Sequence, residues 1–431
     1  MLRKTYHFLL SLLTPGQWFL FVFIFALEIF LRFYQIAERN PFGWDQVDNA
    51  WAAKNIIINH WYPLVGMVAK QNSGFFIGPL YYYAIAVFYF FSNLDPIASG
   101  VFAGVTSAIS FVILFWITKK LFSFETAIIA CFIYTVASYQ IIFDRVQWPV
   151  DLIPAISLLI FYTLYKVITG NPKYLWYLAL SMGIMFQLHF TAVFFPLIVL
   201  LTLPFFPWRK FSLRQIAGSI ALFLAFLIPN FLYELQQKHT QETHMASFFS
   251  SYYHGLHGKR VIQLAGDAFI QFQAYLVFPV LYILKFFLPI LFLFVYLWKK
   301  YTREKILLCY LITLWFLVPW IVFAMYSGEI SDYYFSVNRF IGLLIIAYLL
   351  GKLFTKHILL RIAVIILLLT YGFFNLRMYF QAKDTTLADR EQKVKAAVQK
   401  DEQIQYTQGV PESYLFYYYM RQKGVIVYDK K

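Results

Sequence analysis

Charged side chains are scarce in this chain. They make up 13% of its 431 residues, whereas 61% of the residues are hydrophobic and 22% are aromatic. A soluble domain of this composition would leave too much apolar surface in contact with water, which excludes an ordinary soluble enzyme or binding module. Long apolar runs recur along the whole chain, and we therefore expect an all-α, multi-pass integral membrane protein of the plasma membrane.

Cysteine is also scarce, since only Cys131 and Cys309 occur, both inside apolar runs. Such thiols are expected to be buried and reduced, so no disulfide is expected. The sequence has no zinc-ligand spacing, glycine-rich phosphate loop or basic stripe, and a nucleic-acid partner is not expected. The formal net charge of +15 comes largely from Lys and Arg in short loops, which is typical of membrane orientation.

Eleven apolar runs are expected to be transmembrane helices. They are residues 17–36, 97–117, 125–143, 150–168, 174–189, 191–207, 213–233, 270–297, 305–325, 338–354 and 357–378. Loops rich in Lys and Arg, such as those with Lys119, Arg209 and Lys352, occur at every second turn and are therefore expected in the cytoplasm. The alternate loops are then external, and the longest are 37–96 and 234–269.

A further apolar stretch, residues 75–91, does not fit this alternation. With Arg3 and Lys4 inside, a full crossing by this stretch would reverse the orientation of every later loop. We expect the segment, which has Gly78 and Pro79 near its start, to lie in the membrane interface or to enter the bilayer and return. The alternative is a true crossing with the opposite N-terminal orientation.

The sequence predicts two parts, a transmembrane domain over residues 1–378 and a small external appendage over residues 379–431. Residues Lys383 to Gln405 are rich in charge, and an aromatic run from Tyr414 to Tyr419 follows. The stretch Gly424 to Tyr428 (GVIVY) is typical of a short strand. A segment of this length is too short for a large core of its own.

The first external loop gathers ionisable residues, among them Asp45, Asp48 and Lys70. Residues Gln46 to His60 lack Pro and Gly and have apolar residues at helical spacing, which predicts a short amphipathic helix on the membrane surface. Asp45 begins this helix, and Asp48 shares its face. One interpretation is structural, with Asp45 as a helix cap and Asp48 as a solvated acid of the first turn. The alternative is functional, with Asp45 as a general base at the edge of the bilayer.

Three later positions on the same side carry ionisable residues. Arg145 and Asp151 lie in FDRVQWPVD, where Arg145 is either a phosphate ligand or an anchor that reaches lipid headgroups. His189 lies in QLHFTAV and is either a hydrogen-bonded structural residue or part of a site. Arg339 lies in SDYYFSVNRF and is a second candidate anion ligand, again with a headgroup contact as the alternative.

Four of these segments together resemble a known family. WDQVDNAWAAKNI, the GPLYYY that follows it, FDRVQWPVDL and QLHFTA resemble sequences of the GT-C membrane glycosyltransferases. The similarity is greatest to the group related to protein O-mannosyltransferases and lipid A aminoarabinose transferases. It covers residues 17 to 210, and beyond them the resemblance is one of architecture.

The resemblance implies a GT-C fold and an enzyme that takes a sugar from a polyprenyl-phosphate donor. The acceptor would be a hydroxyl of a glycan, lipid or protein at the external membrane face. Asp45 matches the family's first-loop base, Arg145 and Asp151 match its second external motif, and His189 matches a histidine at a helix junction. Asp48, Asp151 and His189 are candidates for a supporting acid or an acceptor contact.

Two departures from the family pattern bear on the ligands. Asp48 stands where relatives often have a basic residue, so the donor phosphate is expected to contact Lys70, Arg145 or Arg339 instead. Phe76 stands where some relatives have a glutamate that joins a metal site, which makes a divalent metal doubtful, and no other cofactor is expected.

Two other functions are compatible with this architecture. A transporter or flippase of lipid-linked saccharides would have charges at mid-membrane depth, broken helices and two matching halves. Glu28 and Lys285 are the notable charges within apolar runs, and no halves repeat. A ligase or polymerase that joins whole glycans would share the fold, and the sequence does not separate it from a transferase of single sugars.

Overall fold

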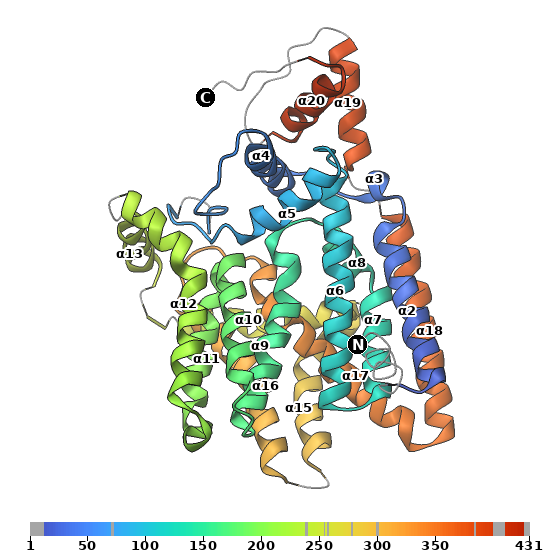
Figure 1. The fold of residues 1–431 in the computed structure, drawn as a ribbon. Helices are drawn as coiled ribbons and strands as arrows, with labels where there is room; N and C mark the ends of the chain where they lie inside the picture. Colours follow the sequence, from blue (N-terminus) through green and yellow to red (C-terminus); the bar gives the residue numbers. More distant parts are fainter. Residues whose placement is uncertain are drawn as a thin grey trace, which may run out of the picture.

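A computed structural model describes residues 13–69, 73–237, 240–253, 255–256, 258–276, 279–298, 301–382, 385–399 and 410–425. These residues are largely helical, and the only β-pairing among them is three isolated bridges. A bundle of apolar helices forms the lower part of the molecule, and shorter helices cover its upper end (Figure 1). The all-α architecture expected from the sequence is confirmed.

The bundle is built from twelve helices. They are α2 (Pro15–Phe33), α6 (Ala98–Leu121), α7 (Phe124–Val136), α8 (Ser138–Asp144), α9 (Ile153–Ile168), α10 (Tyr174–Leu188), α11 (Phe194–Thr202), α12 (Leu213–Gln236), α15 (Leu284–Leu297), α16 (Arg303–Ala324), α17 (Arg339–Lys356) and α18 (Ile358–Gln381). Local chemistry sets their ends. The Thr14 hydroxyl accepts a hydrogen bond from the backbone N–H of Gln17 at the start of α2, and Lys119 and Lys120 lie near the carbonyl end of α6.

The upper layer contains α3 (Ile36–Arg39), α4 (Trp44–Ile58), α5 (Leu80–Phe91), α19 (Leu387–Gln399) and α20 (Pro411–Gln422). Two further helices, α13 (Thr240–Tyr252) and α14 (Gly258–Asp267), belong to the loop expected at residues 234–269. Helix α4 confirms the surface helix predicted in the first loop. It packs against α5 and against α20.

Seven helical segments of the described chain are long and apolar enough to cross a membrane. They are Pro15–Phe33, Ala98–Leu121, Pro149–Ile168, Leu213–Gln236, Arg303–Ala324, Asp332–Lys356 and Ile358–Gln381. Helices α7 and α8 together make an eighth candidate, which is bent by 72°. The other expected spans coincide with apolar helices of fewer than 18 residues, such as α10, so the expected number of eleven is not confirmed.

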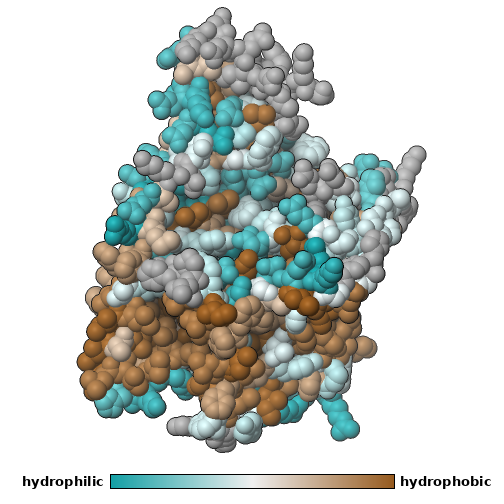
Figure 2. Space-filling view, turned by 180° about the vertical axis from the view of Figure 1, so that it is seen from behind, coloured by the Kyte–Doolittle hydropathy of each residue, from teal (hydrophilic) through white to brown (hydrophobic). Residues whose placement is uncertain are grey.

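The surface agrees with a membrane-embedded bundle. On the face shown in Figure 2, a hydrophobic band crosses the lower half of the molecule, with hydrophilic residues beneath it and a largely hydrophilic upper part. The loops that join α11 to α12 and α17 to α18 lie at the lower end (Figure 1), and the first of them carries Arg209 and Lys210. The protein is therefore a multi-pass membrane protein whose basic loops lie opposite the layer with α4.

The stretch 75–91 forms a helix, α5, only over its last 12 residues. A helix of this length rises about 18 Å, whereas the hydrocarbon core of a bilayer is about 30 Å thick. Figure 1 shows α5 beside α4 at the upper end of the bundle. The helix is too short to cross the bilayer alone, as expected for a segment in the interface.

The C-terminal helices α19 and α20 pack on each other and on the first-loop helices α3 and α4. The hydroxyl of Tyr414, a fully buried residue of α20, donates to the carbonyl oxygen of Leu94 at 2.9 Å. Trp51 Nε1 donates to Ser413 Oγ at 3.3 Å. The strand predicted at Gly424 to Tyr428 lies mostly outside the described residues, and the division of the chain at residue 378 stays a prediction.

We expect Tyr414→Ala to detach α20 from α4. Loss of a buried aromatic ring typically lowers the folding stability by about 3–5 kcal/mol. A pair of helices as small as α19 and α20 is not expected to stay docked after a loss of this size. Limited proteolysis of the protein in detergent should then cleave near α20 much faster than in the wild type. Tyr414→Phe keeps the ring and loses one hydrogen bond, so its cleavage should stay close to that of the wild type. Equal cleavage of the Ala variant and the wild type would contradict the docking.

Candidate active site

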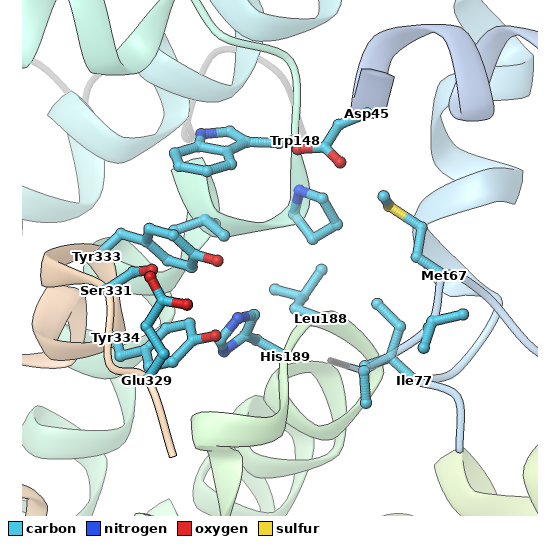
Figure 3. A pocket seen from close by; sticks show the side chains of 14 residues that line it. Asp45, Met67, Ile77, Trp148, Leu188, His189, Glu329, Ser331, Tyr333 and Tyr334 are labelled. Atoms are coloured by element: carbon cyan, nitrogen blue, oxygen red, sulfur yellow. The ribbon is translucent and has the colours of Figure 1, made fainter. Parts of the chain in front are cut away.

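A cavity of about 390 Å³ lies where the N-terminus of α4 meets the ends of several bundle helices (Figure 3). We refer to it as the Asp45 cavity. Its lining residues come from α4, the segment between α4 and α5, the start of the 3₁₀ turn before α9, the end of α10 and the segment after α16. They are Asp45, Met67, Val68, Ala69, Ile77, Trp148, Pro149, Val150, Leu188, His189, Glu329, Ser331, Tyr333 and Tyr334.

Asp45 lies in the first turn of α4, but it is not the helix cap. Gly43 is the N-cap residue, and the side chain of Gln46 bonds back to it, because Gln46 Oε1 accepts from the backbone N–H of Gly43 at 2.8 Å. Within the described part of the chain, the Asp45 carboxylate takes part in no hydrogen bond or ion pair, and Figure 3 shows it at the cavity. The capping alternative is therefore wrong, and the carboxylate is available to a ligand.

The surroundings of Asp45 make it a better proton acceptor than an ordinary aspartate. Burial raises the pKa of its carboxyl group, and the negative charge of Asp48 raises this pKa further. Asp48 itself accepts a hydrogen bond from the hydroxyl of Tyr82 at 2.5 Å. Burial also raises the pKa of Asp48, and the bond from Tyr82 opposes this change. Asp48 does not line the Asp45 cavity.

Hydrogen bonds fix α4 against the segment that follows α8. Gln46 Nε2 donates to the carbonyl oxygen of Gln147 at 2.7 Å, and Gln147 Nε2 donates to the hydroxyl of Tyr81 at 3.0 Å. Asn40 Nδ2, just before α4, donates to the carbonyl oxygen of Arg145 at 3.2 Å. The position of Asp45 is thus set by its immediate neighbour on α4.

His189 lines the cavity together with Asp45. It ends α10, and its Nδ1 lies 3.0 Å from Thr191 Oγ1 and accepts from the backbone N–H of Thr191 at 3.3 Å. Because Nδ1 is an acceptor there, a neutral His189 carries its proton on Nε2. The ring also packs against Tyr334, with centroids 5.8 Å apart. His189 is therefore held in one orientation and has one N–H to donate.

Two of the three expected phosphate ligands, Arg145 and Arg339, do not line this cavity. Arg145 is buried and donates to the carbonyl oxygens of Leu31 at 2.9 Å and Gln35 at 3.2 Å, near the end of α2. Arg339 is fully buried and donates to Gln271 Oε1 at 2.6 Å. Lys70 lies outside the described residues. A phosphate role for Arg145 or Arg339 stays a prediction that this geometry does not favour.

Asp151 also lies away from the cavity lining. It is buried, and its Oδ2 accepts from Thr106 Oγ1 at 3.1 Å. Its neighbours Trp148 and Val150 do line the cavity. The FDRVQWPVD segment therefore contributes to the site through these two side chains, whereas Arg145 and Asp151 were expected. A role of Asp151 in acceptor contact stays a prediction.

Sequence reasoning missed the wall formed by Glu329, Ser331, Tyr333 and Tyr334. These residues follow α16, in a loop expected on the same side as Asp45, and the only residue of this segment predicted to bind a ligand was Arg339. The available signal was a pair of adjacent tyrosines, Tyr333 and Tyr334, four residues after Glu329 in a loop expected to be external. Their convergence with α4 depends on contacts between segments almost 300 residues apart, which local patterns do not encode.

The described residues form no group of three or more His, Cys, Asp or Glu that fits a metal ion. Of the histidines in the loop expected at 234–269, His244 is described, and its Nδ1 lies 2.9 Å from the carbonyl oxygen of Gly74.

No protein-family model matches the chain, and no curated protein is similar to it in sequence. Solved structures are similar in fold. ArnT from Cupriavidus metallidurans bound to undecaprenyl phosphate has a TM-score of 0.63 at 11% identity, with 93% of this chain and 85% of that chain covered. The apo state of the same protein has a TM-score of 0.60 at 12% identity, over 91% and 84% of the chains.

An oligosaccharyltransferase from Archaeoglobus fulgidus in the apo form is also similar. Its TM-score is 0.54 at 10% identity, with 96% of this chain and 60% of that chain covered. At such low identities the comparisons establish the fold alone. ArnT and this oligosaccharyltransferase are both GT-C proteins, and the fold expected from the sequence is confirmed. The chain is an all-α, multi-pass membrane protein with the GT-C fold.

Proposed function

We propose that the protein is a membrane glycosyltransferase that moves a sugar from a polyprenyl-phosphate donor to a hydroxyl group, with Asp45 as general base. The observation that carries the proposal is the Asp45 carboxylate, which is half-buried, has no partner among the described residues and lines a cavity at one end of an apolar bundle. A fold shared with a protein that binds undecaprenyl phosphate supports the choice of donor.

The reaction is a single displacement at the anomeric carbon. Asp45 accepts the proton of the acceptor hydroxyl, whose oxygen forms the new bond to this carbon. The bond between the anomeric carbon and the phosphate oxygen breaks at the same time, and its electron pair leaves with the lipid phosphate. A positioned carboxylate typically contributes about 10²–10⁴-fold to such a step. The product has the inverted anomeric configuration.

The leaving phosphate gains negative charge and needs hydrogen-bond donors. The described lining of the cavity has no Lys or Arg, but the Nε2–H of His189 and the hydroxyls of Ser331, Tyr333 and Tyr334 are donors there. Lys70 belongs to the segment between α4 and α5 that supplies Met67 to Ala69, and it stays a candidate for the phosphate. The acceptor is a glycan, lipid or protein hydroxyl.

We place the cavity on the external face of the membrane. The loops with Arg209, Lys210 and the end of α17 lie at the other end of the bundle, and Lys and Arg favour the cytoplasmic side. A site at the membrane edge suits a donor whose lipid tail stays in the bilayer while its sugar reaches the cavity.

The raised pKa of Asp45 predicts the pH dependence of transfer. The base form exists only above this pKa, so the rate should fall as the pH drops through it. The midpoint of that acidic limb should lie above 3.8, the ordinary pKa of an aspartate. In Asp48→Asn the acidic limb should shift to lower pH, because the negative charge of Asp48 contributes to the raised pKa of Asp45. Initial rates measured between pH 3 and 8 test this, and an acidic limb with its midpoint at the ordinary aspartate value would contradict the assignment.

Proteoliposomes separate this function from that of a transporter or flippase. Labelled donor is placed in the leaflet that the Asp45 cavity faces, together with a mixture of hydroxyl acceptors. A transferase forms labelled product and leaves the remaining donor in its leaflet. Movement of intact donor to the other leaflet without product would overturn the proposal in favour of a transporter. Transfer of whole oligosaccharides in preference to single sugars would identify a glycan ligase of the same fold.

A further inference from the structure

One side of the Asp45 cavity is aromatic. Trp148, Tyr333 and Tyr334 lie along this side, and Met67 lies across from them (Figure 3). The ring centroids of Trp148 and Tyr333 are 5.1 Å apart, and those of Tyr333 and Tyr334 are 4.7 Å apart. The wall therefore presents a continuous run of ring surface close to the carboxylate.

Trp148 is held in place by its neighbours. The ring of Phe143 packs against it with centroids 5.5 Å apart and planes at 64°, and Tyr333 packs on it at a tilt of 57°. Pro149 follows directly and restricts the backbone of Trp148 to an extended conformation, which is observed as φ −156° and ψ 160°. The indole is thus preorganised at the cavity.

The positions of Trp148 and Asp45 are coupled. Gln46 follows Asp45, Gln147 precedes Trp148, and the side chain of Gln46 donates to the carbonyl oxygen of Gln147 at 2.7 Å. Both glutamines are buried. This bond between the immediate neighbours of the two residues keeps the carboxylate and the indole at a constant separation.

A role in packing alone does not account for Trp148. Its ring is only half-buried, and its enclosed Nε1–H has no hydrogen-bond partner among the described residues. Buried tryptophans usually have a partner for this group. A half-buried aromatic ring in a cavity with a few polar groups is typical of ligand sites.

We propose that Trp148 is a binding residue for the sugar ring of the donor, which stacks its C–H face on the indole beside Asp45. This inference rests on the proposed function. The C–H groups on one face of a sugar carry partial positive charge, and they are attracted to the negative face of an indole. In Figure 3, Asp45 lies near the Trp148 end of this wall and His189 near its Tyr334 end, so a sugar ring stacked on the indole would have the base toward one end and a donor to the phosphate toward the other.

Binding to lipid nanodiscs that contain the purified protein tests this placement. The probes are a polyprenyl-phosphate-linked hexose, a polyprenyl-phosphate-linked pentose and the sugar-free polyprenyl phosphate. Trp148→Leu should bind the better of the two sugar-bearing lipids roughly ten-fold more weakly than the wild type, as expected for loss of an aromatic contact. Its affinity for the sugar-free lipid should be unchanged. Trp148→Phe retains a ring and should lose less.

Trp61→Leu is the matched control, because Trp61 is exposed and does not line the cavity. Equal loss of affinity for both kinds of lipid in Trp148→Leu would mean a structural effect and would overturn the inference. Unchanged affinity for the sugar-bearing lipids would also overturn it, while leaving the proposed function intact. If the wild-type protein binds neither lipid, the proposed function fails together with the inference.

Discussion

Asp45→Asn is expected to lower the turnover number for sugar transfer by about 10²–10⁴-fold, the usual contribution of a general base. Asparagine has almost the same shape as aspartate but does not accept the proton of the acceptor hydroxyl at neutral pH. The carboxylate makes no hydrogen bond or ion pair with the described residues, so the substitution should leave folding and donor binding close to those of the wild type. Turnover with saturating donor, measured beside the thermal stability of each variant, checks both statements.

Asp48→Asn is the control for this substitution. It lies one helical turn further along α4, and its carboxylate accepts from Tyr82 instead of lining the cavity. An asparagine retains an oxygen that accepts this bond. At a pH above the acidic limb, Asp48→Asn should therefore keep most of the turnover. Equal losses of turnover in Asp45→Asn and Asp48→Asn would show that transfer depends on the negative charge of this helical turn and not on a base at residue 45.

Arg32→Met is expected to destabilise the bundle by about 3–5 kcal/mol, the usual cost of removing one partner from a buried ion pair. The guanidinium of Arg32 lies 2.7 Å from Glu28 Oε2 and 2.8 Å from Asp144 Oδ2, and these three side chains are at most 4% exposed. Without Arg32, two carboxylates would remain together in the bundle without a cation.

Arg32 also satisfies backbone groups at the bend between α7 and α8. It donates to the carbonyl oxygens of Thr135 at 2.6 Å and Tyr134 at 3.1 Å, which a continuous helix would pair with the N–H groups of the next turn. The N–H of Ser138 at this bend instead donates to Asn375 Oδ1 at 2.9 Å. Helix α8 follows this bend, and Trp148 comes four residues after its end, so the cluster supports the site at a distance.

Thermal unfolding in detergent measures this effect. Glu28→Gln and Asp144→Asn added to Arg32→Met remove the unpaired charges and should recover part of the stability. Arg361→Met is the control, because Arg361 is exposed at the start of α18 and surface changes usually stay within about 0.5 kcal/mol. An Arg32→Met protein as stable as this control would contradict a stabilising role for the cluster.

The sequence predicted those features of the site that depend on local patterns. The helical spacing after Pro41 predicted α4 with Asp45 at its start, and QLHFTA predicted a helix junction at His189; both residues reach the Asp45 cavity. The fold class followed from composition and from the resemblance, and the structural comparisons confirm it.

Other features depend on tertiary contacts that a single sequence does not display. Arg145 was expected at the donor phosphate because arginine suits this ligand, yet it donates to carbonyl groups at the end of α2. Tyr333 and Glu329 reach the cavity only because the segment after α16 returns beside α4. The expected number of eleven spans is not confirmed, since helices such as α10 are apolar but shorter than 18 residues.

The most direct test of the account is transfer of labelled sugar by the purified protein in lipid. The donors are a panel of polyprenyl-phosphate sugars, offered with glycan, lipid and peptide hydroxyls, and wild type and Asp45→Asn are compared. The account predicts a labelled product of inverted anomeric configuration with the wild type, and its loss in a variant that still folds. Transfer by Asp45→Asn at the wild-type rate, or a product of retained configuration, would contradict it.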